Sequence, residues 1–243
     1  MGFTLGILGG GLQGLEAAFL ARMEGWDTVV ADARPAPPAS RLAGRFVRTE
    51  VRTAGDLDRA FKGADFVLPC LEDLGTLDAL FGKGAHSAPA TPAHFDCDSF
   101  RLTRDKLLSK ELFAECGIPC PLSPPEAGLP LVSKPADQSG SKGVRILRTT
   151  GELAEALASG AGGVIEEYCP GPSYSVEVTG RPGDYLSWPV TFLEMDGRFD
   201  CRRVTAPADL GPEDERGFRR HALAAAEALK LRGIMDMEII MSP

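Results

Sequence analysis

The chain has 243 residues, of which 44% are hydrophobic and 25% are charged, proportions that are ordinary for a globular domain with a real core. Its formal net charge is −8, and no basic stretch stands out, which argues against a nucleic-acid-binding surface. No apolar run reaches membrane-spanning length, and the N-terminus lacks the basic region of a signal peptide.

The six cysteines stand at positions 70, 97, 116, 120, 169 and 201. None of them forms a C-x-x-C pair, so a zinc ribbon or a thioredoxin-like motif is not expected. Several lie within apolar runs, which is typical of small buried side chains. We therefore expect a protein of the reducing cytoplasm.

Residues 1–95 alternate short apolar strands with helices. Strands are predicted over residues 3–8, 28–31 and 66–71, and helices over residues 12–24 and 56–61. The first helix carries apolar residues at helical spacing, namely Leu12, Leu15, Phe19, Leu20 and Met23. This alternation predicts a parallel α/β sheet.

A glycine loop joins the first strand to the first helix. Residues 9–14 fit the pattern G-x-G-x-x-G, and Asp32 follows at about the distance of a ribose-binding acid. Alone, this pattern indicates an NAD(P)-binding oxidoreductase or sensor. Glu16 opposes that interpretation, because its charge in the first helix would repel a pyrophosphate. No group suited to hydride transfer follows.

Residues 96–125 are predicted to connect two domains. A long helix is expected over residues 104–115, with a buried stripe made by Leu107, Leu108, Leu112 and Phe113. Gly117 and Pro119 should stop this helix, and the proline-rich stretch that follows reads as a connector.

The remainder of the chain has a different pattern. Strands are predicted over residues 131–134, 144–147, 164–168, 174–178, 185–195 and 234–241, and helices over residues 152–158 and 212–231. Gly233 is expected to end the last helix. Few helices separate these strands, so we predict an α+β region with mostly antiparallel pairing.

A series of residues suited to phosphate and adenine stands in order along this region. Lys106 opens the long helix, Lys134 ends a strand, and Ser139, Gly140 and Ser141 lie in a glycine-containing loop. Such loops bring backbone N–H groups to phosphate oxygens, and lysines add point charges. A later strand carries Glu166, Glu167 and Tyr168 into an extended hinge, which can present backbone groups to an adenine edge.

The last strand places two carboxylates on one face. Side chains alternate along a strand, so Asp236 and Glu238 should face a cleft that also holds Lys134. The apolar residues between them, Met235, Met237 and Ile239, should pack into the core. Paired carboxylates suit Mg²⁺ or a substrate ammonium group.

Taken together, these segments resemble the ATP-grasp superfamily, and most closely the pyrrolysine-biosynthesis ligases that join 3-methylornithine to lysine. The resemblance rests on segments spread along nearly the whole chain, namely residues 10–18, 103–106, 109–110, 117–119, 166–168, 200–201, 204–207 and 233–238. It implies a Rossmann-like pre-ATP-grasp domain at 1–95, the connector, a small ATP-grasp lid at 126–170, and an incomplete large ATP-grasp lobe at 171–243.

The resemblance also implies a function. ATP would phosphorylate a carboxylate, and an amine would then attack the acyl phosphate to give an amide. Lys106 and Lys134 would hold phosphates, residues 166–168 would flank adenine, and Glu238 would hold Mg²⁺. Our candidates for the polar ends of the two amino-acid substrates are Gln13, Glu16, Glu72 and Asp236. Neither a nucleic acid nor a membrane is expected as a partner, whereas a homo-oligomer is allowed.

Two features depart from the family pattern. The hinge is followed by Pro172 and Ser173 where many members carry a ribose-binding glutamate. The sequence also stops at Pro243, before the strand that carries a second Mg²⁺ carboxylate in the family. We therefore expect a ligase whose active site is incomplete, or a non-catalytic nucleotide-binding half-enzyme that needs a partner.

Overall fold

The computed structural model describes residues 2–83, 85–136, 143–159 and 163–242. The chain divides into two compact units, Met1–Asp98 and Ser99–Pro243. Within the described residues, no helix is both long enough and apolar enough to cross a membrane.

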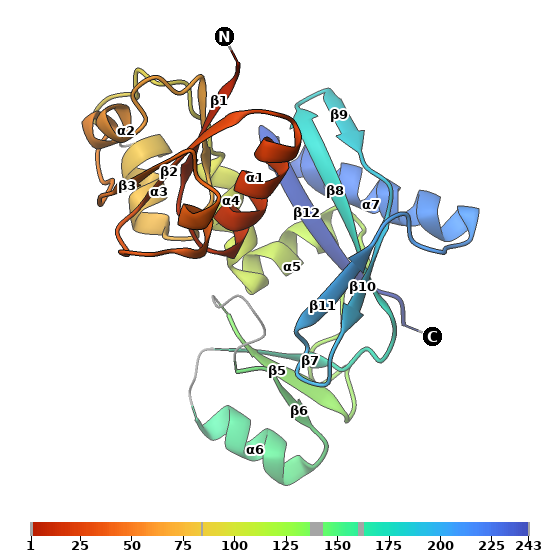
Figure 1. Ribbon diagram of the computed structural model, residues 1–243. Coiled ribbons are helices and arrows are strands. Elements are labelled where there is room, and N and C mark those ends of the chain that lie inside the picture. Colours follow the sequence, from red (N-terminus) through yellow and green to blue (C-terminus); the bar gives the residue numbers. More distant parts are fainter. Residues whose placement is uncertain (1, 84, 137–142, 160–162, 243) are drawn as a thin grey trace. The chain divides into compact units, whose positions relative to one another are not determined.

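The first unit is a parallel sheet with helices on both faces (Figure 1). Its strands are β1 (Thr4–Leu8), β2 (Asp27–Asp32), β3 (Arg45–Arg48) and β4 (Phe66–Pro69), and its helices are α1 (Leu12–Met23), η1 (Pro38–Arg41), α2 (Ala54–Ala60) and α3 (Leu74–Phe81). The strand order is β3-β2-β1-β4, and all pairs are parallel. The predicted parallel α/β sheet is confirmed, although β3 and α3 were not predicted.

Two apolar clusters hold this sheet between its helices. On one face α1 and η1 pack against Ile7 and Val30, and on the other α2 packs through Leu57 and Phe61. The residues that α1 buries are all small, namely Gly14, Ala18 and Ala21. They bring the helix close to the sheet, and Gly14 is required because a Cβ there would lie 2.0 Å from the Gly9 carbonyl oxygen.

The second unit contains two antiparallel sheets. Its strands are β5 (Leu131–Pro135), β6 (Arg145–Leu147), β7 (Gly163–Glu167), β8 (Ser173–Arg181), β9 (Asp184–Ser187), β10 (Thr191–Met195), β11 (Cys201–Thr205) and β12 (Gly233–Ile240). Among the described residues, β6-β5-β7 form one sheet, and β11-β10-β8-β12 with β9 form the other. The helices are α4 (Cys97–Arg104), which begins at the boundary between the units, α5 (Lys106–Glu115), α6 (Thr150–Ala158) and α7 (Pro212–Leu229). The predicted antiparallel pairing is confirmed.

Four local predictions for this unit were wrong. The single strand expected over residues 185–195 forms two strands, β9 and β10. The helix expected over 104–115 is interrupted at Asp105, whose carboxylate accepts hydrogen bonds from the backbone N–H groups of Leu107 and Leu108 and so starts α5. Leu107 and Leu108 are 50% and 44% exposed, so the expected buried stripe does not form. Lys230, in a left-handed conformation, ends α7, and Gly233 begins β12.

The larger sheet is covered by α7, which positions its strands for the site described below. Ala222, Ala225 and Ala226 of α7 are fully buried against Val176 and Val178 of β8. The small alanines allow close packing, and the valines supply β-branched surface. This face of β8 is therefore the core face, and alternation turns Ser175 and Glu177 to the opposite face.

Candidate functional site

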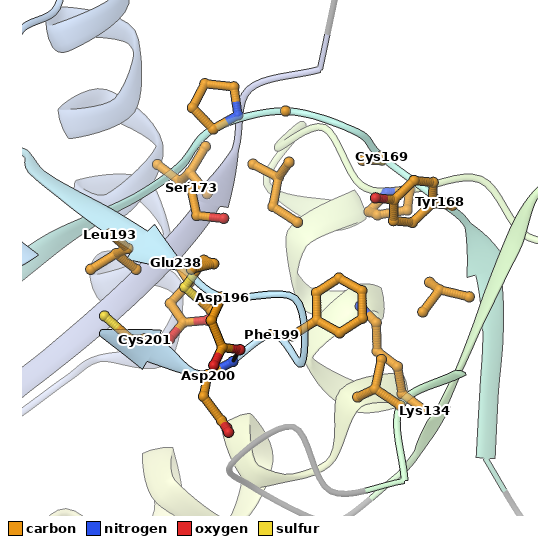
Figure 2. Close-up of a pocket in the computed structure, with 18 of the residues that line it drawn as sticks. Lys134, Tyr168, Cys169, Ser173, Leu193, Asp196, Phe199, Asp200, Cys201 and Glu238 are labelled. Carbon is orange, nitrogen blue, oxygen red and sulfur yellow. Dashed lines mark hydrogen bonds between the residues drawn. The ribbon is translucent and has the colours of Figure 1, made fainter. Parts of the chain in front are cut away.

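A cavity of about 820 Å³ lies within the second unit. Its lining comes from β5, from the segment after β7, from the β10–β11 hairpin and from β12. Figure 2 shows Lys134, Tyr168 and Phe199 toward one end of this cavity and Glu238 and Asp196 toward the other. The cavity thus joins a cation, aromatic rings and carboxylates drawn from segments far apart in the sequence.

Lys134 reaches the cavity from β5. Its Nζ lies 2.6 Å from Oε1 of Glu166, whose Oε2 lies 3.4 Å from Nζ of Lys110. The Glu166 side chain is 9% exposed, and its charge is balanced by the two lysines, as a buried carboxylate requires. Glu166 does not line the cavity, whereas Lys134 does. Lys110 was not predicted from the sequence, because its partner stands 56 residues away.

The segment that follows β7 forms one wall. Glu167, Tyr168 and Cys169 line the cavity. The connector holds this wall in place, because the backbone N–H of Glu167 donates to the Leu122 carbonyl oxygen at 2.8 Å. Gly171 is required here, since a Cβ on it would lie 2.0 Å from the Met241 carbonyl oxygen. The end of β12 therefore lies directly against this hinge.

Alternation along β12 brings Glu238 to the cavity. Met237 is buried, and Met235 and Ile239 are partly buried in the core, whereas Asp236 and Glu238 are exposed. Glu238 lines the same cavity as Lys134, while Asp236 does not. Their placement follows from pairing with β8, which sets Glu238 opposite Ser175 and Asp236 opposite Glu177.

Asp236 belongs to a group of acidic side chains on this face. The Asp236 residue keeps contact with solvent, but the protein packed around its carboxyl group desolvates it. This desolvation, followed by the like charges of Glu177 and Glu238, raises the pKa of Asp236 to about 6. Such a carboxyl becomes fully ionised only near neutral pH or when a cation binds beside it. Glu177 was not predicted, although the alternation of Tyr174, Val176 and Val178 could have shown that it faces outward.

The described residues contain no group of three His, Cys, Asp or Glu side chains that could by itself hold a metal ion. Glu238 brings the carboxylate of β12 to the cavity, and the other acidic residues that line it, Glu194, Asp196 and Asp200 of the β10–β11 hairpin and Glu167 of β7, do not gather with it into such a group. Mg²⁺ is commonly bound by one or two carboxylates together with substrate phosphates and water. The donor set therefore fits a Mg²⁺ that arrives with a phosphate ligand, and does not fit a metal held by the protein alone.

The β10–β11 hairpin contributes residues that sequence reasoning missed. The Asp196 carboxylate accepts hydrogen bonds from the backbone N–H groups of Arg198 and Asp200, and these bonds lower its pKa. Phe199, at the tip, has φ of 64°, a left-handed conformation that a bulky residue rarely adopts. Its ring lines the cavity (Figure 2). The sequence offered one sign of this hairpin, because the adjacent residues Asp200 and Cys201 are among the segments on which the family resemblance rests.

Of the other predicted nucleotide contacts, Lys106 lines the cavity from the start of α5, and its backbone N–H donates to the Ala136 carbonyl oxygen at 3.2 Å. Ser139, Gly140 and Ser141 lie outside the described residues.

The remaining predicted substrate contacts lie in the first unit. Gln13 and Glu16 are exposed on the first turns of α1, and Glu72 is exposed shortly after β4. These positions follow the carboxyl ends of the adjacent parallel strands β1 and β4, the edge at which such sheets bind ligands. Burial, with a smaller contribution from the charge of Glu16, raises the pKa of the nearby Cys70 to about 11, so this thiol stays protonated.

Asp32 does not have the surroundings of a ribose-binding acid. Its Oδ2 accepts hydrogen bonds from the Gly10 backbone N–H at 2.7 Å and from Arg34 at 2.6 Å, and its Oδ1 accepts from the Arg34 backbone and Nε. Pro37 lies against the same loop, within 2.8 Å of where a Cβ on Gly10 would stand. The carboxylate is thus engaged in holding the loop closed, which opposes the interpretation of the glycine loop as an NAD(P) site.

Residues 103–243 match the ATP-grasp domain family. The chain is 34% identical over 241 residues to the 3-methyl-D-ornithine–L-lysine ligase of Methanosarcina mazei, with 99% of this chain and 62% of that protein aligned. It thus spans less than two thirds of that relative's length.

Solved structures give the same fold. The N5-carboxyaminoimidazole ribonucleotide synthetase of Thermotoga maritima matches with a TM-score of 0.72 at 26% identity, over 99% of this chain and 65% of that one. The N5-carboxyaminoimidazole synthetase of Staphylococcus aureus, solved with ADP, matches with a TM-score of 0.76 at 20% identity, over 100% of this chain and 68% of that one.

Proposed function

Because this chain belongs to the ATP-grasp family, we propose that it is an ATP-dependent carboxylate–amine ligase that joins two amino acids through an amide bond. The observation that carries the proposal is the single cavity lined by Lys134, by the hinge residues Glu167 and Tyr168, and by Glu238. A site for a nucleoside triphosphate needs a cation that binds phosphate, an apolar wall beside exposed backbone, and a carboxylate that binds the metal.

We assign the following roles within that cavity. Lys106 and Lys134 bind phosphate oxygens of ATP, and the backbone and side chains of Glu167 and Tyr168 flank the adenine. Glu166 acts there mainly through its ion pair with Lys134. Glu238 binds Mg²⁺ together with the phosphates. When bound, Mg²⁺ neutralises charge on the phosphate oxygens during transfer.

The proposed reaction has two steps. An oxygen of the substrate carboxylate attacks the γ-phosphorus of ATP, the bond to the bridging oxygen breaks, and ADP leaves. The amine of the second amino acid then attacks the acyl carbon, phosphate leaves with the acyl oxygen, and the nitrogen loses a proton. The chain's own contribution is to position the reactants and to stabilise charge on the phosphates with lysines.

For the substrates we propose 3-methylornithine and lysine, as in the Methanosarcina mazei relative, and hence a place in pyrrolysine biosynthesis. Both substrates are cationic. The exposed Asp236, with Glu177 beside it, suits an ammonium group, and Gln13, Glu16 and Glu72 are further candidates. All six cysteines are free thiols, which supports a reducing cytoplasm as the location.

Titration calorimetry of the purified chain with ATP and Mg²⁺ tests the proposal. We expect Lys134→Met to weaken ATP binding by about tenfold or more, since a charge-assisted contact to phosphate is lost. Lys110→Met is the matched control. It removes the same charge from the same Glu166 carboxylate but lies outside the cavity, and its effect should be much smaller.

Two results would contradict the proposal. The first is the absence of ATP binding by the unaltered chain. The second is an equal loss in the Lys134 and Lys110 variants, which would mean that Lys134 acts only through Glu166. Turnover is measured separately, as ADP and amide formed from 3-methylornithine and lysine.

A further inference from the structure

Three charged side chains meet beside the cavity of the second unit. The Glu166 carboxylate of β7 lies between two lysines, Lys134 of β5 and Lys110 of α5. The Glu166 side chain is 9% exposed, and those of Lys134 and Lys110 are 28% and 24% exposed. Of the three, Lys134 lines the cavity (Figure 2), whereas Glu166 and Lys110 do not. We call these three residues the charged triad.

Sheet register explains how two members of the triad meet. In the antiparallel pairing of β5 with β7, Glu166 stands opposite Val132, and Lys134 is two residues farther along β5. Residues two apart on a strand share a face, so Lys134 is the diagonal neighbour of Glu166. Lys110 comes from a helix, and its Nζ also donates to Oγ of Ser123 at 3.0 Å. The carboxylate is therefore held by segments far apart in the chain.

A lysine paired so closely with a carboxylate makes a poor phosphate site by itself. Nζ of Lys134 lies 2.6 Å from Oε1 of Glu166, so the fields of the two opposite charges largely cancel at a ligand beyond them. The carboxylate also competes with phosphate oxygens for the N–H donors of the ammonium group. Glu166 thus holds Lys134 in place but opposes the attraction that Lys134 could offer to a phosphate.

The second lysine resolves this conflict. Nζ of Lys110 lies 3.4 Å from Oε2 of Glu166, the oxygen that Lys134 does not use. With two lysines and one carboxylate, the triad has a net positive charge, and Lys134 is the member that presents it to the cavity. Lys110 also keeps the buried carboxylate paired when the Lys134 ammonium group is shared with a phosphate, and an unpaired buried charge would be costly.

We propose that Lys110 is a positioning residue for the bound nucleotide. It balances the charge of Glu166, so that this carboxylate can fix the position of Lys134 without cancelling its charge. Lys110 itself touches no part of the ligand and acts through the other two members of the triad. The inference rests on the proposed function, since it takes ATP as the occupant of the cavity.

Titration calorimetry with ATP and Mg²⁺ on the full chain tests the proposal. We expect Lys110→Met to weaken ATP binding by about threefold, less than Lys134→Met does, because the lost charge lies farther from the phosphate. Lys110→Arg keeps the positive charge and should bind ATP nearly as well as the unaltered chain. Ser123→Ala is the matched control, because it removes only the uncharged partner of Lys110 and should change ATP binding little.

A second substitution separates this role from a merely structural one. Adding Glu166→Gln to Lys110→Met removes the carboxylate that Lys110 balanced and restores the net charge of the triad. The double variant should therefore recover most of the lost affinity, since Lys134 again presents an uncancelled charge. If Lys110 only supported the packing around β7, losing a second polar partner would not restore ATP binding. Circular dichroism with thermal melting checks that each variant is folded.

Several results would overturn the proposal while leaving ATP binding itself established. These are an unchanged affinity in Lys110→Met, an equal loss in Lys110→Arg or in Ser123→Ala, and a double variant that binds ATP no better than Lys110→Met alone. Absence of ATP binding by the unaltered chain would instead overturn the proposed function, and this inference with it.

Discussion

At the scale of single residues, Asp32 illustrates how a side chain can look like a ligand contact and act as a structural one. Arg34, two residues away, and the Gly10 backbone N–H lower the pKa of Asp32 from 3.8 to about 2, against the opposing effect of burial. A carboxyl group whose pKa is lower in the folded chain than in the unfolded chain stabilises the fold at pH values above the unfolded pKa. That contribution is lost as the pH falls from 3.8 through 2.

We therefore expect Asp32→Asn to destabilise the first unit at pH 7 by about 1–3 kcal/mol, because the Gly10 and Arg34 donors lose a charged acceptor. The deficit should shrink as the pH falls below 3.8 toward 2, where the native carboxyl becomes protonated. Urea unfolding, followed by Trp26 fluorescence in a Trp188→Phe background, measures this. Asp27→Asn, at the exposed start of the same strand, is the control. Equal deficits in both variants, or one that does not depend on pH, would contradict the assignment.

At the scale of elements, β12 divides its side chains between the core and the cavity. Met237 packs with the core that α7 covers, and Glu238 next to it lines the cavity. The strand can do both because successive side chains point to opposite faces. A shift of one residue in its register with β8 would bury Glu238 and expose Met237, so core packing fixes the position of the carboxylate.

We expect Glu238→Gln to weaken ATP binding by about tenfold or more when Mg²⁺ is present and to change it little when Mg²⁺ is absent. The substitution removes a charged oxygen ligand with almost no change in volume. Calorimetry with and without a chelator measures the difference. Asp236→Asn, on the same face but outside the cavity, should change neither value. Equal losses with and without Mg²⁺ would mean that Glu238 does not bind the metal.

At the scale of the whole molecule, the two units have separate cores. The clusters of the first unit are built on the parallel sheet, and that of the second is built on β8, β12 and α7. The cavity that we propose for the nucleotide is lined by residues of the second unit alone. Nucleotide binding should therefore act on one unit more than on the other.

Hydrogen exchange measured with and without ADP and Mg²⁺ checks this expectation. At a free nucleotide concentration about a hundred times Kd, we expect up to about 2.7 kcal/mol of added protection in β5, β7 and β12, since the ligand binds only the folded unit. Exchange in β1, β2 and β4 should change little. Lys134→Met should lose the protection in the second unit. Comparable protection of both sheets would show that the units behave as one cooperative body.

The sequence by itself determined those elements whose signal is local. Short apolar runs predicted β1, β2 and β4, because a buried strand needs only its own side chains to be recognised. It could not reveal β3 and β11, whose residues are largely exposed and which lie at the edges of their sheets. Such strands are held by backbone hydrogen bonds to a neighbour, and no pattern of side chains records that pairing.

The candidate site likewise combines residues that the sequence indicated with contacts that only the structure revealed. Lys134, Tyr168 and Glu238 could be chosen from residue type and strand alternation, which are properties of short segments. Only the tertiary structure decided that Glu166 is paired with Lys134 and Lys110, and that α1 turns its large apolar residues outward. A charge acts through whatever lies within a few ångströms of it, and those neighbours are set by sheet register and helix packing between segments far apart in the chain.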